Sequence, residues 1–289
     1  MLWVADATLT IIPEPTMLTL RSPAKINLFL RVLNKRADGY HEIASLFQAI
    51  DIFDTLNFSF SNHDHLTCNN PHIPTDRSNL IWKSIEAFRT ATGLQQSVTI
   101  ELQKNIPHEA GLGGGSSNAA TALWALNELH QRPLDKEELI SLAAHVGSDV
   151  PFFFSGGTAF CTGRGEKMQP LEPIPPQNLW IVKPAVGLST QKVYAQYDPL
   201  SSKERDTAHA LLGAQAGLPT YFNDLEAPAF ALCPSLKELR RRLRQDGFDY
   251  VAMAGSGTSF ICIGDAEPSI VDVWKCKAAY INSLESQWY

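Results

Sequence analysis

The feature that most constrains this chain of 289 residues is a glycine run at residues 111–115. Four of these five positions are glycine, and the sequence Ser-Ser-Asn follows directly at residues 116–118. Glycine adopts backbone conformations that other residues avoid, and it lets backbone N–H groups come close to a ligand. Serine and asparagine are favoured at helix starts, and the alanine- and leucine-rich residues 119–129 predict a helix. The pattern therefore predicts a tight loop that leads directly into a helix.

A loop of this kind is suited to hold an anion. A helix N-terminus carries about half a positive charge and several unpaired N–H donors, which favour phosphate. The hydroxyls of Ser116 and Ser117 can add hydrogen bonds to a phosphate or to a hydrated cation. No lysine precedes the serines, so the loop is not a Walker A motif, and residues 107–110 separate it from the preceding strand, unlike a Rossmann fingerprint. A flexible glycine loop without a ligand is the alternative interpretation.

Hydrophobic periodicity along the chain predicts a mixture of strands and helices in an α+β fold of two layers, without a long series of βαβ units. Strands are predicted at residues 18–33, 43–50, 54–60, 98–102, 158–161 and 180–182, and two apolar runs at 251–257 and 258–263 flank a glycine turn. Helices are predicted at residues 79–90, 119–129, 139–146, 190–196 and 234–245, with Asp135 and Glu138 as a capping box, and residues 61–76 are predicted to be a loop.

Four prolines within residues 170–176 predict a linker between two domains. We therefore expect an N-terminal domain at residues 18–170, with the ATP-binding and catalytic groups discussed below, and a C-terminal, substrate-side domain at residues 177–289. Residues 1–17 are predicted to be a disordered extension, because their composition fits neither a signal peptide nor a transit peptide.

Composition narrows the class of partner. The formal net charge is −6, which argues against nucleic acid as the main partner. No apolar stretch approaches the roughly 18 residues that span a bilayer, so no membrane partner is expected. The five cysteines are scattered and form no C-x-x-C pair, which favours reduced thiols and a cytoplasmic location. We expect a monomer or a weak homodimer that binds a small molecule.

Several residues outside the glycine run can carry chemistry, although each has an ordinary structural alternative. Lys25 begins an apolar strand, where it is either functional or a solvated strand end. Asp149 borders the apolar sequence VPFFF, so it is either a partly desolvated general base or a turn cap. Tyr40 and His41 can stack on a base and hydrogen-bond to it, or form a plain surface pair. The turn at residues 255–258 either approaches a substrate or closes a hairpin.

Taken together, these segments resemble the GHMP kinases. The sequence PHEAGLGGGSSNAA at residues 107–120 is similar to the ATP loop of that superfamily. Residues 22–30 (SPAKINLFL), 36–41 (RADGYH), 147–152 (GSDVPF) and 254–258 (AGSGT) are similar to motifs of its 4-diphosphocytidyl-2-C-methyl-D-erythritol kinase family. The motifs follow the family's order over nearly the whole chain.

The resemblance implies a two-domain GHMP kinase fold, with an N-terminal ribosomal-S5-domain-2-like domain and a C-terminal ferredoxin-like domain. It implies transfer of the γ-phosphate of ATP to the 2-hydroxyl of a cytidine diphosphate sugar alcohol, in the non-mevalonate route to isoprenoid precursors. Mg²⁺ is implied as the partner of ATP. Such transfer depends mainly on positioning and on neutralising phosphate charge.

The resemblance also implies roles for particular residues. Asp149 matches the catalytic carboxylate and Lys25 the lysine that pairs with it. The residues implied to bind ATP are Asn79, Lys104, Pro107, Gly111, Leu112, Gly113, Gly114, Gly115, Ser116 and Ser117. The residues implied to bind the cytidyl group are Asn27, Tyr40, His41 and Tyr194. The ligand of the metal ion stays unassigned; Ser117 is the candidate, together with phosphates and water.

Two alternatives stay open from the sequence. The first is another GHMP kinase, of the mevalonate or homoserine type. Tyr40, His41 and Tyr194 argue against it, because those acceptors carry no base on which a ring can stack. The second is a non-catalytic GHMP-fold binding protein, and the presence of both Lys25 and Asp149 argues against that.

Overall fold

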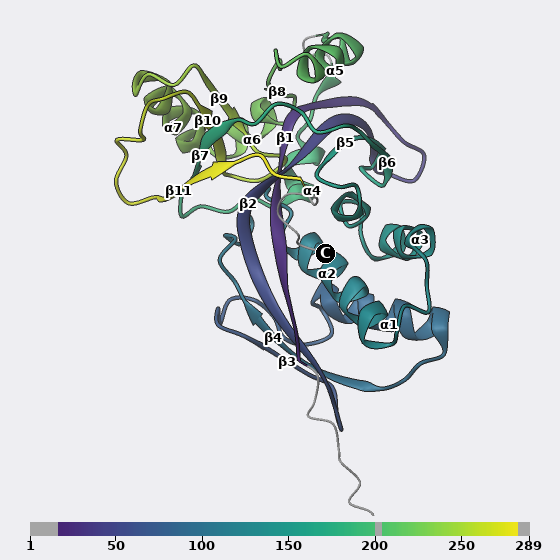
Figure 1. Ribbon diagram of the computed structural model, residues 1–289. Coiled ribbons are helices and arrows are strands. Elements are labelled where there is room, and N and C mark those ends of the chain that lie inside the picture. The colour runs from purple at the N-terminus through teal and green to yellow at the C-terminus, as the bar shows by residue number, and fades with distance from the viewer. Residues whose placement is uncertain (1–16, 200–203, 283–289) are drawn as a thin grey trace, which may run out of the picture.

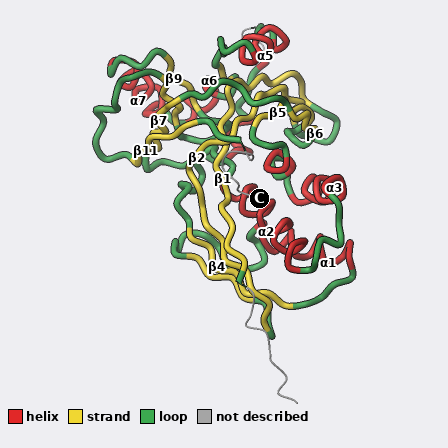
Figure 2. The backbone as a smooth tube through the Cα atoms, in the orientation of Figure 1, coloured by secondary structure: helices red, strands yellow, loops and turns green. Residues whose placement is uncertain are grey.

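The computed structural model describes residues 17–199 and 204–282, which form two β-sheets with helices packed on them (Figures 1 and 2). The predicted α+β fold is confirmed. The extension predicted at residues 1–17 lies outside the described residues, except for Met17. Within the described ranges, no helix has both the length and the apolar character that crossing a membrane requires.

The first sheet is built on a long antiparallel hairpin, β1 (Leu18–Lys35) and β2 (His41–Ser61). Its strand order is β3-β4-β2-β1-β8, with β5 paired to β2 and β6 paired to β5. The other strands are β3 (His65–Cys68), β4 (Ser97–Gln103), β5 (Thr158–Gly163), β6 (Lys167–Pro170) and β8 (Phe222–Asn223). β1 runs through Pro23 without a break, because a register shift between Pro23 and Ala24 accommodates the proline, which has no N–H to donate.

Three helices lie together on one side of this hairpin: α1 (Leu80–Thr92), α2 (Gly114–Leu129) and α3 (Lys136–Val146) (Figure 1). They bury a core with the sheet that includes Phe58, Phe88 and Leu123, each fully buried. The capping box predicted at Asp135 and Glu138 opens α3. The short 3-10 helix η1 (Pro151–Phe154) follows α3.

The second sheet has the strand order β11-β7-β10-β9. Its strands are β7 (Asn178–Lys183), β9 (Tyr250–Met253), β10 (Phe260–Ile263) and β11 (Trp274–Ala279), all antiparallel to their neighbours. β10 therefore separates the parallel strands β7 and β9, which is the split βαβ arrangement of the ferredoxin-like fold, as predicted. The connection contains α4 (Thr190–Ala195), α5 (Thr207–Gln215), α6 (Glu226–Leu232) and α7 (Pro234–Gln245).

Three local predictions differ from the structure. Helix α2 begins at Gly114 and not at residue 119, because Gly113 takes a left-handed conformation (φ +67°) and the helix follows at once. Residues 61–76 are not all loop, since β3 pairs in parallel with β4. The strands predicted at 43–50 and 54–60 are one strand, β2, held together by pairing along its whole length.

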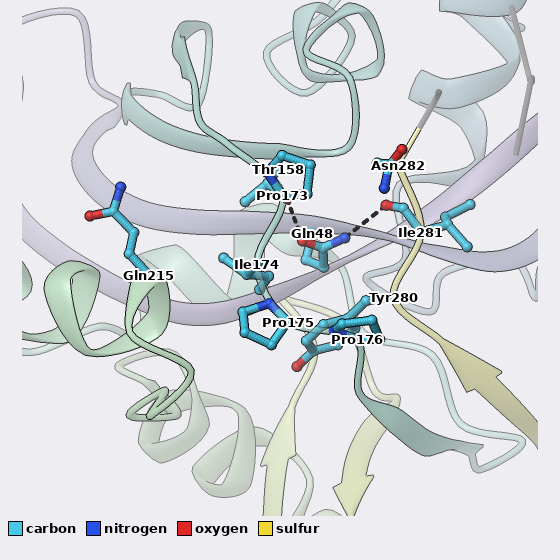
Figure 3. Close-up of a pocket in the computed structure, with 10 residues that line it drawn as sticks. All are labelled: Gln48, Thr158, Pro173, Ile174, Pro175, Pro176, Gln215, Tyr280, Ile281 and Asn282. Carbon is cyan, nitrogen blue, oxygen red and sulfur yellow. Dashed lines mark hydrogen bonds between the residues drawn. The ribbon is translucent and has the colours of Figure 1, made fainter. Parts of the chain in front are cut away.

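The two sheets meet at a junction around Gln48 of β2 (Figure 3). Gln48 accepts a hydrogen bond from Thr158 Oγ1 at 2.6 Å and donates to the backbone oxygen of Ile281 at 2.9 Å. The prolines of residues 173–176 lie beside it and line a hollow of about 340 Å³. The proline-rich segment and the end of the chain thus converge on one strand, while the exact domain limits at 170 and 177 stay a prediction.

The packing of the first core gives a stability prediction. Phe58 is fully buried between the sheet and the helices. We expect Phe58→Ala to lower the free energy of unfolding by about 3–5 kcal/mol, because it removes apolar contacts and leaves a cavity. Leu218→Ala is the control: its side chain is 76% exposed, so a change within about 0.5 kcal/mol is expected. Denaturant unfolding measures both, and similar values for the two variants would contradict this account of the core.

Candidate active site

The centre of the site is a pair formed by Lys25 of β1 and Asp149, which lies in the turn between α3 and η1. Lys25 Nζ lies 3.2 Å from Asp149 Oδ2. The lysine is almost fully buried, whereas the aspartate side chain is 31% exposed. The structure therefore fixes the cation and leaves the carboxylate accessible from the neighbouring cavity, as a proton acceptor requires.

Neighbours on the sheet fix the position of the ammonium group. Asn27 lies two residues further along β1, so its side chain points to the same face. Its Oδ1 accepts a hydrogen bond from Lys25 Nζ at 2.9 Å, and its Nδ2 donates to Ser45 Oγ at 2.8 Å. The ring of Phe47 lies under the ammonium group, with 4.3 Å between Nζ and the ring centroid, a favourable cation–π contact.

The glycine run lies next to this pair and ends in an open helix start. Asn79 and Asp135 cap α1 and α3 with their side chains, whereas Gly113 leaves the start of α2 without a side-chain cap. The N–H groups of the first turn of α2 have no partner within the helix and are free for an anion. A Cβ atom added to Gly113 would lie 2.8 Å from Lys25 Cγ. An anion bound at the helix start is therefore adjacent to the lysine–aspartate pair.

A second glycine turn supports the first. Residues 255–257 connect β9 to β10, and a Cβ atom on Gly257 would overlap the backbone of Ala110 and Gly111. Conversely, a Cβ atom on Gly111 would overlap the backbone oxygen of Ala254. The two turns are packed backbone against backbone. The turn closes a hairpin, and Gly255 lines the cavity; its approach to a substrate stays a prediction.

The pair, the glycine run and the residues predicted to bind a base share one cavity of about 1020 Å³. Predicted site residues among its lining are Lys25, Asn27, Tyr40, His41, Gly111, Gly113, Asp149 and Tyr194. His41 stacks on Tyr194, with ring centroids 5.2 Å apart and 26° between the planes. A base between these rings needs about 7 Å, twice the contact distance between carbon atoms. The two rings therefore have to separate before a base can enter between them.

The surroundings of both rings favour their uncharged forms. Burial, and then the positive charge of Lys35, lower the pKa of His41 below its ordinary value. Burial, and then the negative charge of Asp149, raise the pKa of Tyr194. Neutral His41 presents one donor and one acceptor nitrogen, which suits the edge of a neutral base.

Other predicted ATP-binding residues lie outside the cavity lining. Ser117 is fully buried, and its Oγ accepts a hydrogen bond from Ser22 Oγ at 2.7 Å. Its hydroxyl therefore faces the sheet, and contact with Mg²⁺ or phosphate would require the first turn of α2 to rearrange. Ser116 is partly exposed and Gly115 is exposed at the helix start. Pro107 and Leu112 belong to the loop, where the backbone oxygen of Leu112 accepts from Lys25 N at 2.9 Å.

Asn79 and Lys104 already have partners in the protein. Asn79 Oδ1 accepts from Ile81 N at 3.0 Å, and its Nδ2 donates to Pro74 O at 2.8 Å. Lys104 is ion-paired with Asp54, and its Nζ lies close to Gly114 at the start of α2. The roles of Asn79 and Lys104 toward adenine and ribose stay predictions. The structure places Lys104 beside the start of α2, where the anion is predicted to bind.

The structure adds Arg164 to the site, which the sequence did not single out. Arg164 lines the cavity, and its guanidinium lies 4.8 Å from the centroid of the Tyr40 ring. It stands between Gly163 and Gly165, and a Cβ atom on Gly165 would lie 3.1 Å from Asp149 Oδ1. The sequence signal that marks this turn is an arginine flanked by two glycines. Both glycines have a positive φ in the structure.

The fold and the site define a small-molecule kinase of the GHMP class, and comparisons with known proteins agree. Residues 79–157 match the GHMP kinases N terminal domain, and residues 205–280 match the GHMP kinases C terminal domain. L. major mevalonate kinase in complex with R-mevalonate shares the fold, with a TM-score of 0.68 at 14% identity over 94% of this chain and 98% of that one.

Closer relatives define the family. The 4-diphosphocytidyl-2-C-methyl-D-erythritol kinase of Protochlamydia amoebophila is 50% identical over 93% of this chain and 91% of its own length. The chloroplastic enzyme of the same name from Oryza sativa subsp. japonica is 40% identical over 95% and 73%. A crystal structure of 4-(cytidine 5'-diphospho)-2C-methyl-D-erythritol kinase superimposes with a TM-score of 0.78 at 34% identity, covering 91% of this chain and 99% of that one. The chain belongs to the 4-diphosphocytidyl-2-C-methyl-D-erythritol kinase family, as its motifs indicated.

The contact between the two glycine turns gives a prediction about the anion site. We expect Gly257→Ala to reduce ATP affinity at least tenfold, about 1.4 kcal/mol, because the added methyl group displaces the backbone of Ala110 and Gly111. Gly93→Ala is the control, because nothing lies within 4 Å of a Cβ atom added to Gly93. Gly93 has a positive φ, so its variant loses some stability but should retain ATP affinity. Calorimetric titration with ATP distinguishes the two, and unchanged affinity in Gly257→Ala would contradict the prediction.

Proposed function

We propose that the protein transfers the γ-phosphate of ATP to the 2-hydroxyl of 4-diphosphocytidyl-2-C-methyl-D-erythritol. The observation that carries the proposal is the Lys25–Asp149 pair, which lies between an open helix start and a cavity lined by Tyr40, His41 and Tyr194. The helix start suits the donor and the rings suit a cytosine. Relatives with that activity in their name, up to 50% identical, support the same acceptor.

The proposed reaction is an in-line displacement. The acceptor oxygen attacks the γ-phosphorus, its bond to that phosphorus forms, and the bond to the oxygen bridging the β- and γ-phosphates breaks. The Asp149 carboxylate accepts the proton of the attacking hydroxyl, and ADP leaves. Lys25 balances negative charge at 3.2 Å from the carboxylate, and the N–H groups of α2 stabilise the phosphate oxygens.

The acceptor is held at its cytidyl end. In the proposal, cytosine separates His41 from Tyr194 and stacks on an aromatic face, while Tyr40, 56% exposed, forms the entrance. Asn27 and Lys25 lie deeper in the same cavity, so the sugar alcohol points toward Asp149. We propose that Arg164, which lines the cavity, neutralises the acceptor's diphosphate, because its guanidinium is a rigid phosphate-binding group.

We propose that Mg²⁺ enters as the complex with ATP. Among residues 17–199 and 204–282, no group of three or more His, Cys, Asp or Glu could hold a metal ion, and Ser117 faces the sheet. The proposal therefore assigns the ion to the phosphates and water. The ion neutralises phosphate charge when it is bound. A cytoplasmic location, in line with five free cysteines, and a monomer or weak homodimer complete the proposal.

A coupled assay tests the proposed function directly. The purified protein is incubated with ATP, Mg²⁺ and 4-diphosphocytidyl-2-C-methyl-D-erythritol, and ADP release is followed together with phosphate incorporation into the acceptor. Mevalonate and homoserine serve as comparison acceptors. Turnover of either comparison acceptor without turnover of the cytidyl compound would overturn the proposal.

The proton acceptor can be tested by one substitution. We expect Asp149→Asn to lower kcat by about 10²- to 10⁴-fold, because an amide does not accept the hydroxyl proton. ATP affinity should change little, since the open helix start remains. Asp272→Asn is the control, because Asp272 is exposed and lies outside the cavity lining. A kcat for Asp149→Asn equal to that of the wild type would rule out Asp149 as the base.

The base-stacking ring can be tested separately from the chemistry. We expect Tyr194→Leu to raise the KM for the cytidyl acceptor by about 5- to 150-fold, which corresponds to the 1–3 kcal/mol typical of one stacked base. The KM for ATP should stay constant. Tyr194→Phe keeps the ring and removes the hydroxyl, so its KM for the acceptor should stay within about twofold of the wild type. Equal effects of the two variants would argue against stacking.

A further inference from the structure

A buried carboxylate outside the cavity anchors the anion site from behind. Asp54 of β2 is fully buried. Its Oδ1 accepts hydrogen bonds from the backbone N–H groups of Asn105 and Ile106, at 2.8 and 2.9 Å. Its Oδ2 accepts from Asn118 Nδ2 at 2.9 Å and pairs with Lys104 Nζ. An ionised carboxylate has about four acceptor positions, so Asp54 is saturated by these partners.

The hydrogen bonds continue from Asp54 to the first turn of α2. Because Asp54 only accepts, Asn118 has to turn its NH₂ group toward it. The same nitrogen donates to Ser22 Oγ at 3.0 Å, and Ser22 Oγ donates to Ser117 Oγ at 2.7 Å. Asn118 Oδ1 faces Lys104 Nζ at 3.5 Å. Asp54 therefore sets the orientation of the Asn118 amide and, through it, of the Ser22 hydroxyl.

This series of hydrogen bonds reaches the first turn of α2, where the proposed triphosphate site begins. Ser117 and Asn118 belong to the start of α2, whose open N–H groups face the anion. On the other side, a Cβ atom added to Gly114 would lie 2.9 Å from Lys104 Nζ. Asp54 thus holds both the helix start and a cation beside it, and it does so without lining the cavity.

We propose that Asp54 is a positioning residue for the triphosphate of ATP, acting through Asn118, Ser22 and Lys104. The inference rests on the proposed function, because it assigns the anion at α2 to ATP. Donors stabilise an anion best when they are fixed before it binds. A buried ion pair contributes little net stability compared with apolar packing, so the main effect of this pair is on the geometry of the helix start.

The test replaces the carboxylate with an amide of the same shape. In Asp54→Asn, the new NH₂ group is a donor that faces other donors: either Lys104 and Asn118, or the two backbone N–H groups. The hydrogen bonds that orient Asn118 and Ser22 are therefore lost. We expect ATP affinity, measured by calorimetry, to fall about tenfold or more. The KM for ATP should rise equally, and the KM for the cytidyl acceptor should change less than about twofold. Wild-type affinity for ATP in this variant would overturn the inference.

Asp64→Asn is the matched control. Asp64 accepts two hydrogen bonds of 2.8 Å from Arg89 and one from Val98 N at 3.1 Å, near the start of β4. It has similar partners but no connection to α2 in the hydrogen bonds above. We expect Asp64→Asn to lower the melting temperature without changing ATP affinity. A similar loss of ATP affinity in both variants would assign Asp54 a general structural role and overturn the inference.

Ser22→Ala decides the question if Asp54→Asn does not fold. It removes only the hydroxyl that connects Asn118 to Ser117, and we expect ATP affinity to fall about threefold. Its control is Ser84→Ala, which removes a buried hydroxyl of α1 that donates to Ala119 O of α2. Equal affinities in the two variants would overturn the inference. A wild-type protein that does not bind ATP would instead overturn the proposed function.

Discussion

The pairing of β1 with β2 is the interaction on which the rest of the structure depends. These two strands supply Lys25 and Asn27 to the active site, Asp54 to the rear of the anion site and Gln48 to the junction of the sheets. A slip of one residue would turn each of these side chains to the opposite face. The register shift between Pro23 and Ala24 aligns Ser22 with Asp54 on one side and Lys25 with Ala49 on the other.

Two lysine–carboxylate pairs flank the start of α2, and their exposure separates their functions. Asp54 is fully buried and saturated with hydrogen bonds, so it can orient its neighbours but cannot exchange a proton with a substrate. Asp149 is 31% exposed toward the cavity, so it can reach an acceptor hydroxyl. In the two proposals, the same chemical pair therefore positions its neighbours in the core and takes part in the reaction at the surface of the cavity.

The sequence predicted the features that depend on local pattern. The capping box of Asp135 and Glu138, the helix at residues 234–245 and the α+β class follow from spacing and composition. Strands as short as β3 and β8 exist only through pairing with distant partners, so no local pattern marks them. The lysine–aspartate pair was found through resemblance to a family, since no periodicity connects residues so far apart. The sequence likewise does not predict that Ser117 points into the sheet, because the direction of its side chain depends on how α2 packs.

The stacked rings of His41 and Tyr194 connect the fold to acceptor selection. The two rings already stack on each other, with centroids 5.2 Å apart. An acceptor gains affinity from them only if it replaces this contact with a better one, and a flat base with two faces does so. An acceptor without a base leaves the stack closed and gains nothing from it. In the proposed function, selectivity for a cytidyl group then comes from the difference between two stacking energies, whereas the predicted phosphate site at α2 does not distinguish between acceptors.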